Sequence, residues 1–246
     1  MNKYRADLHI HTVLSPCGDL EMSPANIIEK AREKGLDIIG ITDHNTTRHC
    51  KLIRKLAEPA GIFVLMGAEV TTREEVHCLT FFENDDQLSE FQVYLEKHLP
   101  PVPNNTEMFG YQVVVDEDEQ IIDEIEVLLI SALDQSIEQI EAKVHSLGGI
   151  FIPAHIDRPS YSIISQLGFI PADLLIDGIE ISANGKIASV IPFLGEQAEL
   201  TVIRDSDAHY IENIGNAFSI FEIEHCTFSE VKLALQGKLG RKVIIA

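Results

Sequence analysis

The feature that most constrains this chain is a pair of histidines, His9 and His11, at the end of an apolar segment near residue 1. In a β-strand, side chains two residues apart point to the same side. The two imidazoles therefore converge on one point, and neutral imidazole is a good ligand for a transition metal. A lone His-x-His pair also occurs by chance on surfaces, so the rest of the chain has to supply further ligands.

Four later segments repeat the arrangement of an apolar strand followed or opened by His, Asp or Glu. The residues concerned are Asp43 and His44, Glu69 with His77, His155, and Asp207 with His209. In α/β barrels the carboxyl ends of the parallel strands lie on one face, where active sites are found. Each of these residues, considered alone, is explained equally well as a hydrogen-bonded core residue or a helix cap as it is as a metal ligand. As a set they predict a metal centre at one mouth.

Length and charge narrow the class of protein. The chain has 246 residues, enough for one large α/β domain, and a formal net charge of −20. We expect no extended nucleic-acid surface, because phosphate contacts need clustered Lys and Arg. The acidic run from Asp116 to Glu126 is typical of a solvated hairpin or loop tip. Four dispersed cysteines, and the lack of a signal peptide or a membrane-spanning run, favour a cytoplasmic protein.

Apolar segments of strand length alternate with amphipathic helical segments along most of the chain. The run 38–42, for example, is continuously apolar, and Ser23-Pro24 opens a helix that stops at Gly35. The alternation predicts parallel strands with helical crossovers, and hence an α/β barrel or a doubly wound sheet. Residues 83–136 fit this rhythm poorly. We expect them to be an insertion within a single domain that spans residues 1–246.

The order of these motifs resembles that of a known family. The blocks Asp7–Thr12, Ile41–Asn45, Gly67–Val70, Ala154-His155 and Ser206–His209 are similar to the successive motifs of the PHP (polymerase and histidinol phosphatase) family of metal-dependent phosphoesterases. The resemblance implies a distorted seven-stranded β/α (TIM-like) barrel. It also implies two or three divalent transition-metal ions: Mn, Zn or Fe.

Carried over position by position, the resemblance implies that one ion is held by His9, His11, Glu69 and Asp207. Glu69 would bridge to a second ion bound by His77 and His155, and His44 and His209 would hold a third. Many family members carry Ser-Asp-Gly after the second His, whereas this chain has Pro16 at the Asp position. Cys17 or Asp19 would then complete the third site, or Cys17 is only a small packed residue.

Two further residues are candidates for binding the substrate phosphate. Arg158 lies just beyond His155, where a guanidinium can grip phosphate at two points, although a surface ion pair is the alternative. Asn184 follows an expected strand at residues 178–181, within which Glu180 is taken as structural. His49 and His145, on expected helices, receive no role.

The expected function is hydrolysis of a phosphomonoester of a small metabolite or nucleotide by metal-activated water. Arg158 would offset phosphate charge, and Asp43 would orient a neighbouring histidine. Either His209 or His44, if not committed to metal, would protonate the leaving oxygen. The partner is then a small phosphorylated molecule, with the oligomeric state open. The alternatives are a nuclease or polymerase-associated module, and a metal-binding domain without catalysis.

Overall fold

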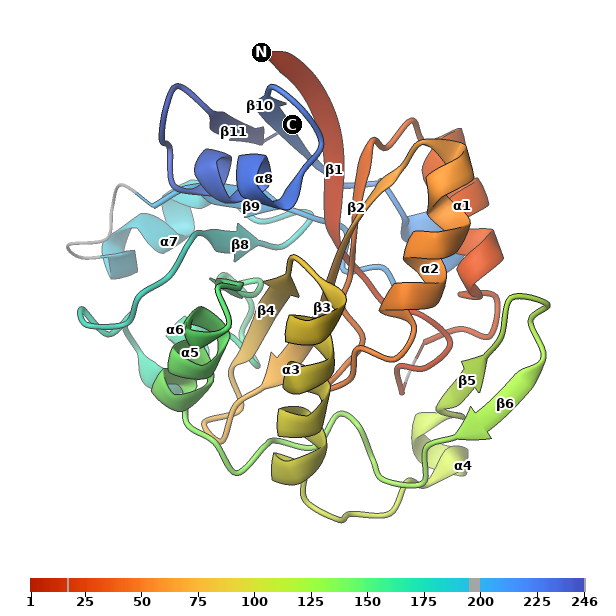
Figure 1. Ribbon diagram of the computed structural model, residues 1–246. Helices are drawn as coiled ribbons and strands as arrows, with labels where there is room; N and C mark the ends of the chain where they lie inside the picture. The colour runs from red at the N-terminus through yellow and green to blue at the C-terminus, as the bar shows by residue number, and fades with distance from the viewer. Residues whose placement is uncertain (17, 195–199, 246) are drawn as a thin grey trace.

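A curled seven-stranded sheet forms the centre of the molecule, and helices cover it (Figure 1). The computed structural model describes residues 1–16, 18–194 and 200–245. In sheet order the strands are β11 (Lys242–Ile245), β10 (Ser219–Ile223), β1 (Asn2–Ile10), β2 (Ile38–Ile41), β3 (Phe63–Thr71), β4 (His77–Phe82) and β7 (Ile150–Pro153). The parallel pair β8 (Ile179–Ile181) and β9 (Val202–Arg204) contacts β7 on one side and β11 on the other. The expected distorted α/β barrel is confirmed.

The direction of the strands differs in part from the expectation. β1, β2 and β3 are parallel, but β3 and β4 form an antiparallel hairpin. Only residues 72–76 separate these two strands, whereas a parallel connection needs a crossover of about a dozen residues or more. The hairpin places His77, the first residue of β4, opposite Thr71 at the carboxyl end of β3.

Eight α-helices are assigned within the described residues. They are α1 (Pro24–Glu33), α2 (Cys50–Ala57), α3 (Asp85–His98), α4 (Thr106–Phe109), α5 (Ile137–Ser146), α6 (Ile163–Leu167), α7 (Ile187–Leu194) and α8 (Phe228–Leu235). Ser23 caps α1 by accepting a bond from Asn26 N, and Pro24 occupies the first turn, as the sequence indicates. In the part of the chain that the structure describes, no helix is long and apolar enough to cross a membrane.

Hydrophobic side chains pack on both faces of the central sheet. Along β3, Val64 and Met66 belong to the larger core cluster, whereas Leu65 belongs to a second one. Alternate residues of a strand point to opposite faces, so each face buries its own layer. At Gly67 the neighbouring strand comes so close that a Cβ would lie 1.8 Å from Thr80 O. This close packing holds the strand ends, and hence the groups they carry, in fixed positions.

Residues 83–136, the expected insertion, form α3, α4 and a separate hairpin of β5 (Val113–Val115) and β6 (Ile121–Glu124). Leu88, Phe91 and Leu95 of α3 are buried in the larger core cluster. The β5–β6 hairpin belongs to a sheet of its own and lies beyond α2, at the lower right of Figure 1.

Candidate metal centre

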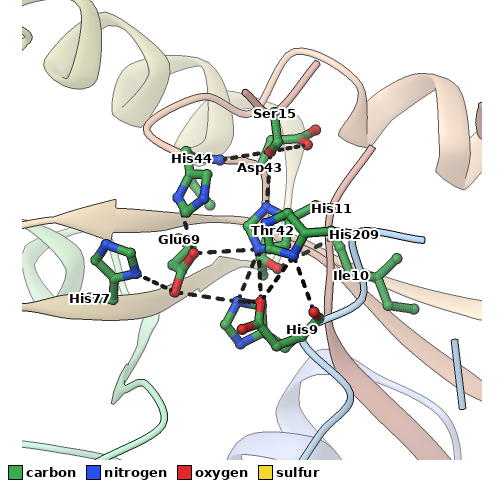
Figure 2. A network of polar contacts seen from close by, with 12 residues as sticks. His9, Ile10, His11, Ser15, Thr42, Asp43, His44, Glu69, His77 and His209 are labelled. Atoms are coloured by element: carbon green, nitrogen blue, oxygen red, sulfur yellow. Dashed lines mark hydrogen bonds and ion pairs between the residues drawn. The ribbon is translucent and has the colours of Figure 1, made fainter. Parts of the chain in front are cut away.

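Four side chains from distant parts of the chain converge at the carboxyl edge of the sheet, and Figure 2 labels three of them, His9, His11 and Glu69. His9 lies in β1 and His11 follows it; Glu69 lies in β3, and Asp207 follows β9. The Nε2 atoms of His9 and His11 are 3.1 Å apart. Asp207 Oδ1 is 3.3 Å from each of these nitrogens. Glu69 Oε1 lies 3.4 Å from His9 Nε2, and Glu69 Oε2 lies 3.4 Å from His11 Nε2.

These separations fit a common metal ion. Two ligands at about 2.1 Å from one tetrahedral ion lie about 3.4 Å apart. Two imidazole nitrogens 3.1 Å apart either share a proton or direct both lone pairs to one ion, and the surrounding carboxylate oxygens complete such an ion's ligands. The residues present therefore fit a divalent transition metal.

Two further ligand groups overlap with the first. One consists of His44, Glu69 and His77, and the other of His11, His44 and His209. Glu69 joins the first two groups, because its Oε2 lies 3.0 Å from His44 Nδ1 and its Oε1 lies 2.8 Å from His77 Nδ1. His155 Nε2 is also 3.1 Å from Glu69 Oε1. The sequence assigned His44 only to the third ion, whereas the structure places it in two groups.

Two buried atoms that face this cluster make no hydrogen bond. They are Asp207 Oδ1 and His44 Nδ1. Each lies within 3.3 Å of a potential partner but without the geometry of a hydrogen bond. Buried polar atoms are nearly always paired, so these two atoms are additional evidence that the cluster is built for ions.

The electrostatics of the cluster favour cation binding. Burial alone would raise the pKa of Glu69, but His77, His9 and His44 hold it well below its usual range. Burial and neighbouring histidine charge lower the pKa of His44 to about 4, and the same causes lower that of His209 to about 3. At neutral pH the Glu69 carboxylate is ionised and these two imidazoles are neutral, which is the state that binds metal. Burial lowers the pKa of His9 and His11, but nearby carboxylates outweigh it and raise both values, so a bound ion would displace a proton from these two rings.

Glu180 positions two of the ligands, a role that the sequence reading missed. Its Oε1 lies 2.9 Å from His9 Nδ1, and its Oε2 accepts the backbone N–H of His155 at 2.8 Å. A carboxylate can only accept, so Nδ1 of His9 carries a proton and Nε2 is the nitrogen that faces the cluster. The signal in the sequence is a lone acid between Ile179 and Ile181 in a buried strand.

Two of the ligand residues adopt a left-handed backbone. The φ angles are 31° at His155 and 50° at Asp207. Such conformations cost non-glycine residues about 1–3 kcal/mol each, and they persist where surrounding contacts impose them. Glu180 supplies two such contacts near His155, since its backbone carbonyl also accepts Ile156 N–H at 2.9 Å.

Asp43 and Arg158 differ in their distance from the cluster. Asp43 is buried behind His11 and accepts a bond from Ser15 Oγ at 2.7 Å. Among the described contacts it reaches His11 through Ser15, whose Oγ lies 2.9 Å from His11 Nδ1. Arg158 Nη1 lies 2.6 Å from Asp207 Oδ2, with its side chain 40% exposed. Arg158 thus borders the ligand set and still reaches solvent.

Among the described candidates, His155, Asp19 and Asn184 lie outside the three groups. Asp19 is next to His209 through its backbone, donating to His209 O at 2.9 Å, but its carboxylate Oδ1 accepts Glu21 N–H. Asn184 is exposed in the turn after β8. Cys17 lies outside the described residues.

The chain belongs to the PHP domain family. The family model matches residues 7–153, more than half of the chain. This match and the ligand groups define a metal-binding hydrolase of the PHP type.

Among curated relatives, the uncharacterized protein YqxK of Bacillus subtilis is 25% identical over 99% of this chain. The phosphoribosyl 1,2-cyclic phosphate 1,2-diphosphodiesterase of Eggerthella lenta is 31% identical over 30% of this chain and 29% of its own length.

Among solved structures, the lesion-specific endonuclease EndoQ from Pyrococcus furiosus superposes with a TM-score of 0.76 at 22% identity, over 98% of this chain. A structure of endonuclease Q in complex with a 27-mer duplex substrate, with an abasic lesion at the active site, gives 0.72 at 22% identity and the same coverage. The chain spans 65% of the length of YqxK and 58% of that of each endonuclease Q chain.

The expectation of a small phosphorylated partner and no nucleic-acid surface is wrong. It rested on the net charge of −20, yet endonuclease Q, which has this fold, is described in complex with duplex DNA at its active site. Net charge is a sum over the whole surface and does not describe the potential at one mouth. Bound divalent ions also reverse the local charge of a carboxylate cluster.

Proposed function

We propose that this PHP-family hydrolase is a metal-dependent nuclease that hydrolyses a phosphodiester bond of DNA. The observation that carries the proposal is the set of three overlapping ligand groups joined through Glu69, His11 and His44. Closely spaced metal ions are suited to phosphoryl transfer, because together they stabilise the attacking and the leaving oxygen.

The scarcity of cationic side chains favours a diester over a monoester. Among the described residues, Arg158 is the only Lys or Arg that forms an ion pair with the ligand set. A phosphodiester carries one negative charge, whereas a monoester carries nearly two at neutral pH. One guanidinium together with the ions is a better match for the singly charged group. The likeness to an endonuclease and to a diphosphodiesterase supports the same bond type.

Bound ions would supply water of lowered pKa and offset charge on the phosphoryl oxygens. The chain's own residues place and hold the reacting groups. Arg158 lies where it can donate to a non-bridging oxygen, next to the cluster and open to solvent. His44 and His209, with pKa values lowered to about 4 and about 3, are neutral at pH 7. They serve as ligands rather than as acids that protonate the leaving oxygen.

A comparison of matched substrates tests the proposal. With Mn²⁺, we expect the protein to hydrolyse bis(p-nitrophenyl) phosphate faster than p-nitrophenyl phosphate, and to cut duplex oligonucleotides with and without an abasic site at different rates. Glu69→Gln should abolish all of these reactions, while Glu222→Gln, at an exposed ion pair with Lys3, should leave them unchanged. Preferential hydrolysis of the monoester, or intact oligonucleotides under all conditions, would overturn the proposal.

A further inference from the structure

His49, the residue before α2, connects the β5–β6 hairpin to the loop that carries the metal ligands. Its side chain is only 1% exposed. Val115 N–H of β5 donates to His49 Nε2 at 3.0 Å. On the other side of the ring, Nδ1 lies 2.7 Å from Thr12 Oγ1. Thr12 directly follows the ligand His11 in the chain.

The tautomer of His49 follows from its backbone partner. A backbone N–H can only donate, so Nε2 accepts and the ring proton resides on Nδ1. His49 therefore donates to Thr12 Oγ1. Burial lowers the pKa of His49, which agrees with a neutral ring. The donor and acceptor directions are thus fixed at the hairpin end.

The donor and acceptor directions of the hydrogen bonds between Thr12 and the metal ligand His11 follow in the same way. Thr12 Oγ1 donates to Asp43 Oδ2 at 2.8 Å, and Ser15 Oγ donates to Asp43 Oδ1 at 2.7 Å. The hydroxyl of Ser15 has thereby used its proton, so it accepts from His11 Nδ1 at 2.9 Å. His11 Nε2 is then the nitrogen that faces Glu69 and Asp207, where it would bind an ion. Figure 2 shows the last part of this chain, from Asp43 through Ser15 to His11.

The hairpin is fastened to the body by side chains rather than by a ladder with the central sheet. Val114 packs against Leu14, two residues beyond Thr12. The acidic tip contacts basic and polar groups of the body through Arg48 to Asp123 at 2.7 Å, Ser23 to Glu119 at 2.5 Å, and Lys55 to Glu117. An element held in this way can dock or release as a unit.

We propose that His49 is a positioning residue that couples docking of the β5–β6 hairpin to the orientation of the metal ligand His11. Coupling between two sites is reciprocal. Metal ions in the cluster stabilise the docked hairpin, and the docked hairpin raises the affinity for metal.

Hydrogen exchange of the wild-type protein is the first test. The Val115 amide should exchange at least about 10-fold more slowly with saturating Mn²⁺ than with chelator, in line with the size of effects transmitted through outer-shell partners of metal ligands. Amides of α8, on the other side of the fold, should change less. Equal protection of Val115 with and without Mn²⁺ would overturn the coupling.

Two substitutions separate the two ends of the link. The amide of His49→Asn can still donate to Thr12 but does not reach Val115, so Mn²⁺ affinity should stay near wild type while β5 exchanges faster. His49→Gln can still accept from Val115 but loses the bond to Thr12, so Mn²⁺ affinity should fall by about 10-fold while β5 stays protected. In both variants Mn²⁺ should no longer slow exchange at β5.

A matched control is His98→Asn, which alters a histidine paired with Asp134 that, among the described contacts, takes no part in this chain of bonds. It should change neither Mn²⁺ affinity nor exchange at β5. If Mn²⁺ slows exchange at β5 equally in wild type, His49→Asn and His49→Gln, then His49 does not carry the coupling.

Discussion

Glu180 Oε1 lies 2.9 Å from Nδ1 of His9, and both side chains are at most 1% exposed. The pair joins β8 to β1, strands 171 residues apart in the sequence. The carboxylate fixes which nitrogen of His9 faces the cluster, and the same carboxylate holds the backbone of His155.

Replacing this carboxylate should weaken metal binding. Loss of such a partner of a metal-ligating histidine typically costs 10–100-fold in metal affinity. We expect Glu180→Gln to lower Mn²⁺ affinity within that range, measured by competition with a chelating dye. Glu222→Gln is the control, because that acid pairs with Lys3 and Lys242 and, among the described residues, belongs to none of the ligand groups. Unchanged affinity in Glu180→Gln would show that His9 is oriented without it.

Metal stoichiometry should distinguish shared from unshared ligands. Glu69 belongs to two of the three ligand groups, and His209 to one. We expect Glu69→Ala to lose metal from two groups and His209→Ala from one, as measured by elemental analysis after gel filtration. Equal losses in the two variants would contradict the assignment of Glu69 as the shared ligand.

Arg158 should matter for turnover more than for metal content. Removing one donor that stabilises charge in a transition state typically costs about 10²–10³ in kcat. We expect Arg158→Ala to reduce hydrolysis of bis(p-nitrophenyl) phosphate by that order with unchanged bound metal, and Arg158→Lys to retain part of the rate. If metal content falls as much as the rate, Arg158 acts by holding the metal ligand Asp207 in place rather than by contacting the substrate.

A second histidine network should make stability depend on pH. His145 lies between Asp177 and Glu141, and bonds to these acids outweigh partial burial and raise its pKa. The pKa of His145 in the folded protein exceeds its value of about 6.5 in the unfolded chain. The stability contributed by protonated His145 is therefore complete below about pH 6.5 and is lost as the pH rises through the folded pKa. Burial would raise the pKa of Asp177, but His145, Phe151 N–H and Gln236 lower it. The stability contributed by ionised Asp177 is present above about pH 4 and is lost only in acid.

We therefore expect the melting temperature to fall between pH 6 and pH 9 by about 2–4 °C more in wild type than in His145→Gln. That difference corresponds to about 1 kcal/mol for one charge-assisted hydrogen bond in a protein of this size. Differential scanning fluorimetry across this range measures it. Parallel curves for the two proteins would show that His145 does not titrate with unfolding.

The sequence could place the candidate ligands close to one another because strand geometry is local. The spacing of His9 and His11, and the position of Asp207 at the end of a strand, place side chains without knowledge of the rest of the fold. His77 reaches the same edge only because β4 is antiparallel to β3, a direction that the alternation of elements does not reveal.

Glu180 and His49 were assigned no functional role because their roles depend on partners far away in the sequence. Glu180 pairs with His9, and His49 bonds a backbone amide 66 residues later. No spacing in the chain encodes such contacts. At both positions a polar side chain lies in a segment that is buried in the folded protein. That burial can be recognised only from the three-dimensional structure.

The spread of the ligands along the chain has a consequence for folding. His9 lies in the first strand and Asp207 follows the ninth, so the ligand group that contains both is completed only when nearly all of the chain has folded. Contacts this distant in sequence form late, because a large loop has to close before they contribute. During synthesis on the ribosome, a chain shorter than about two hundred residues lacks Asp207, and early fragments offer only His9 and His11. Binding of an ion by that group would therefore require a chain that has been synthesised at least as far as Asp207.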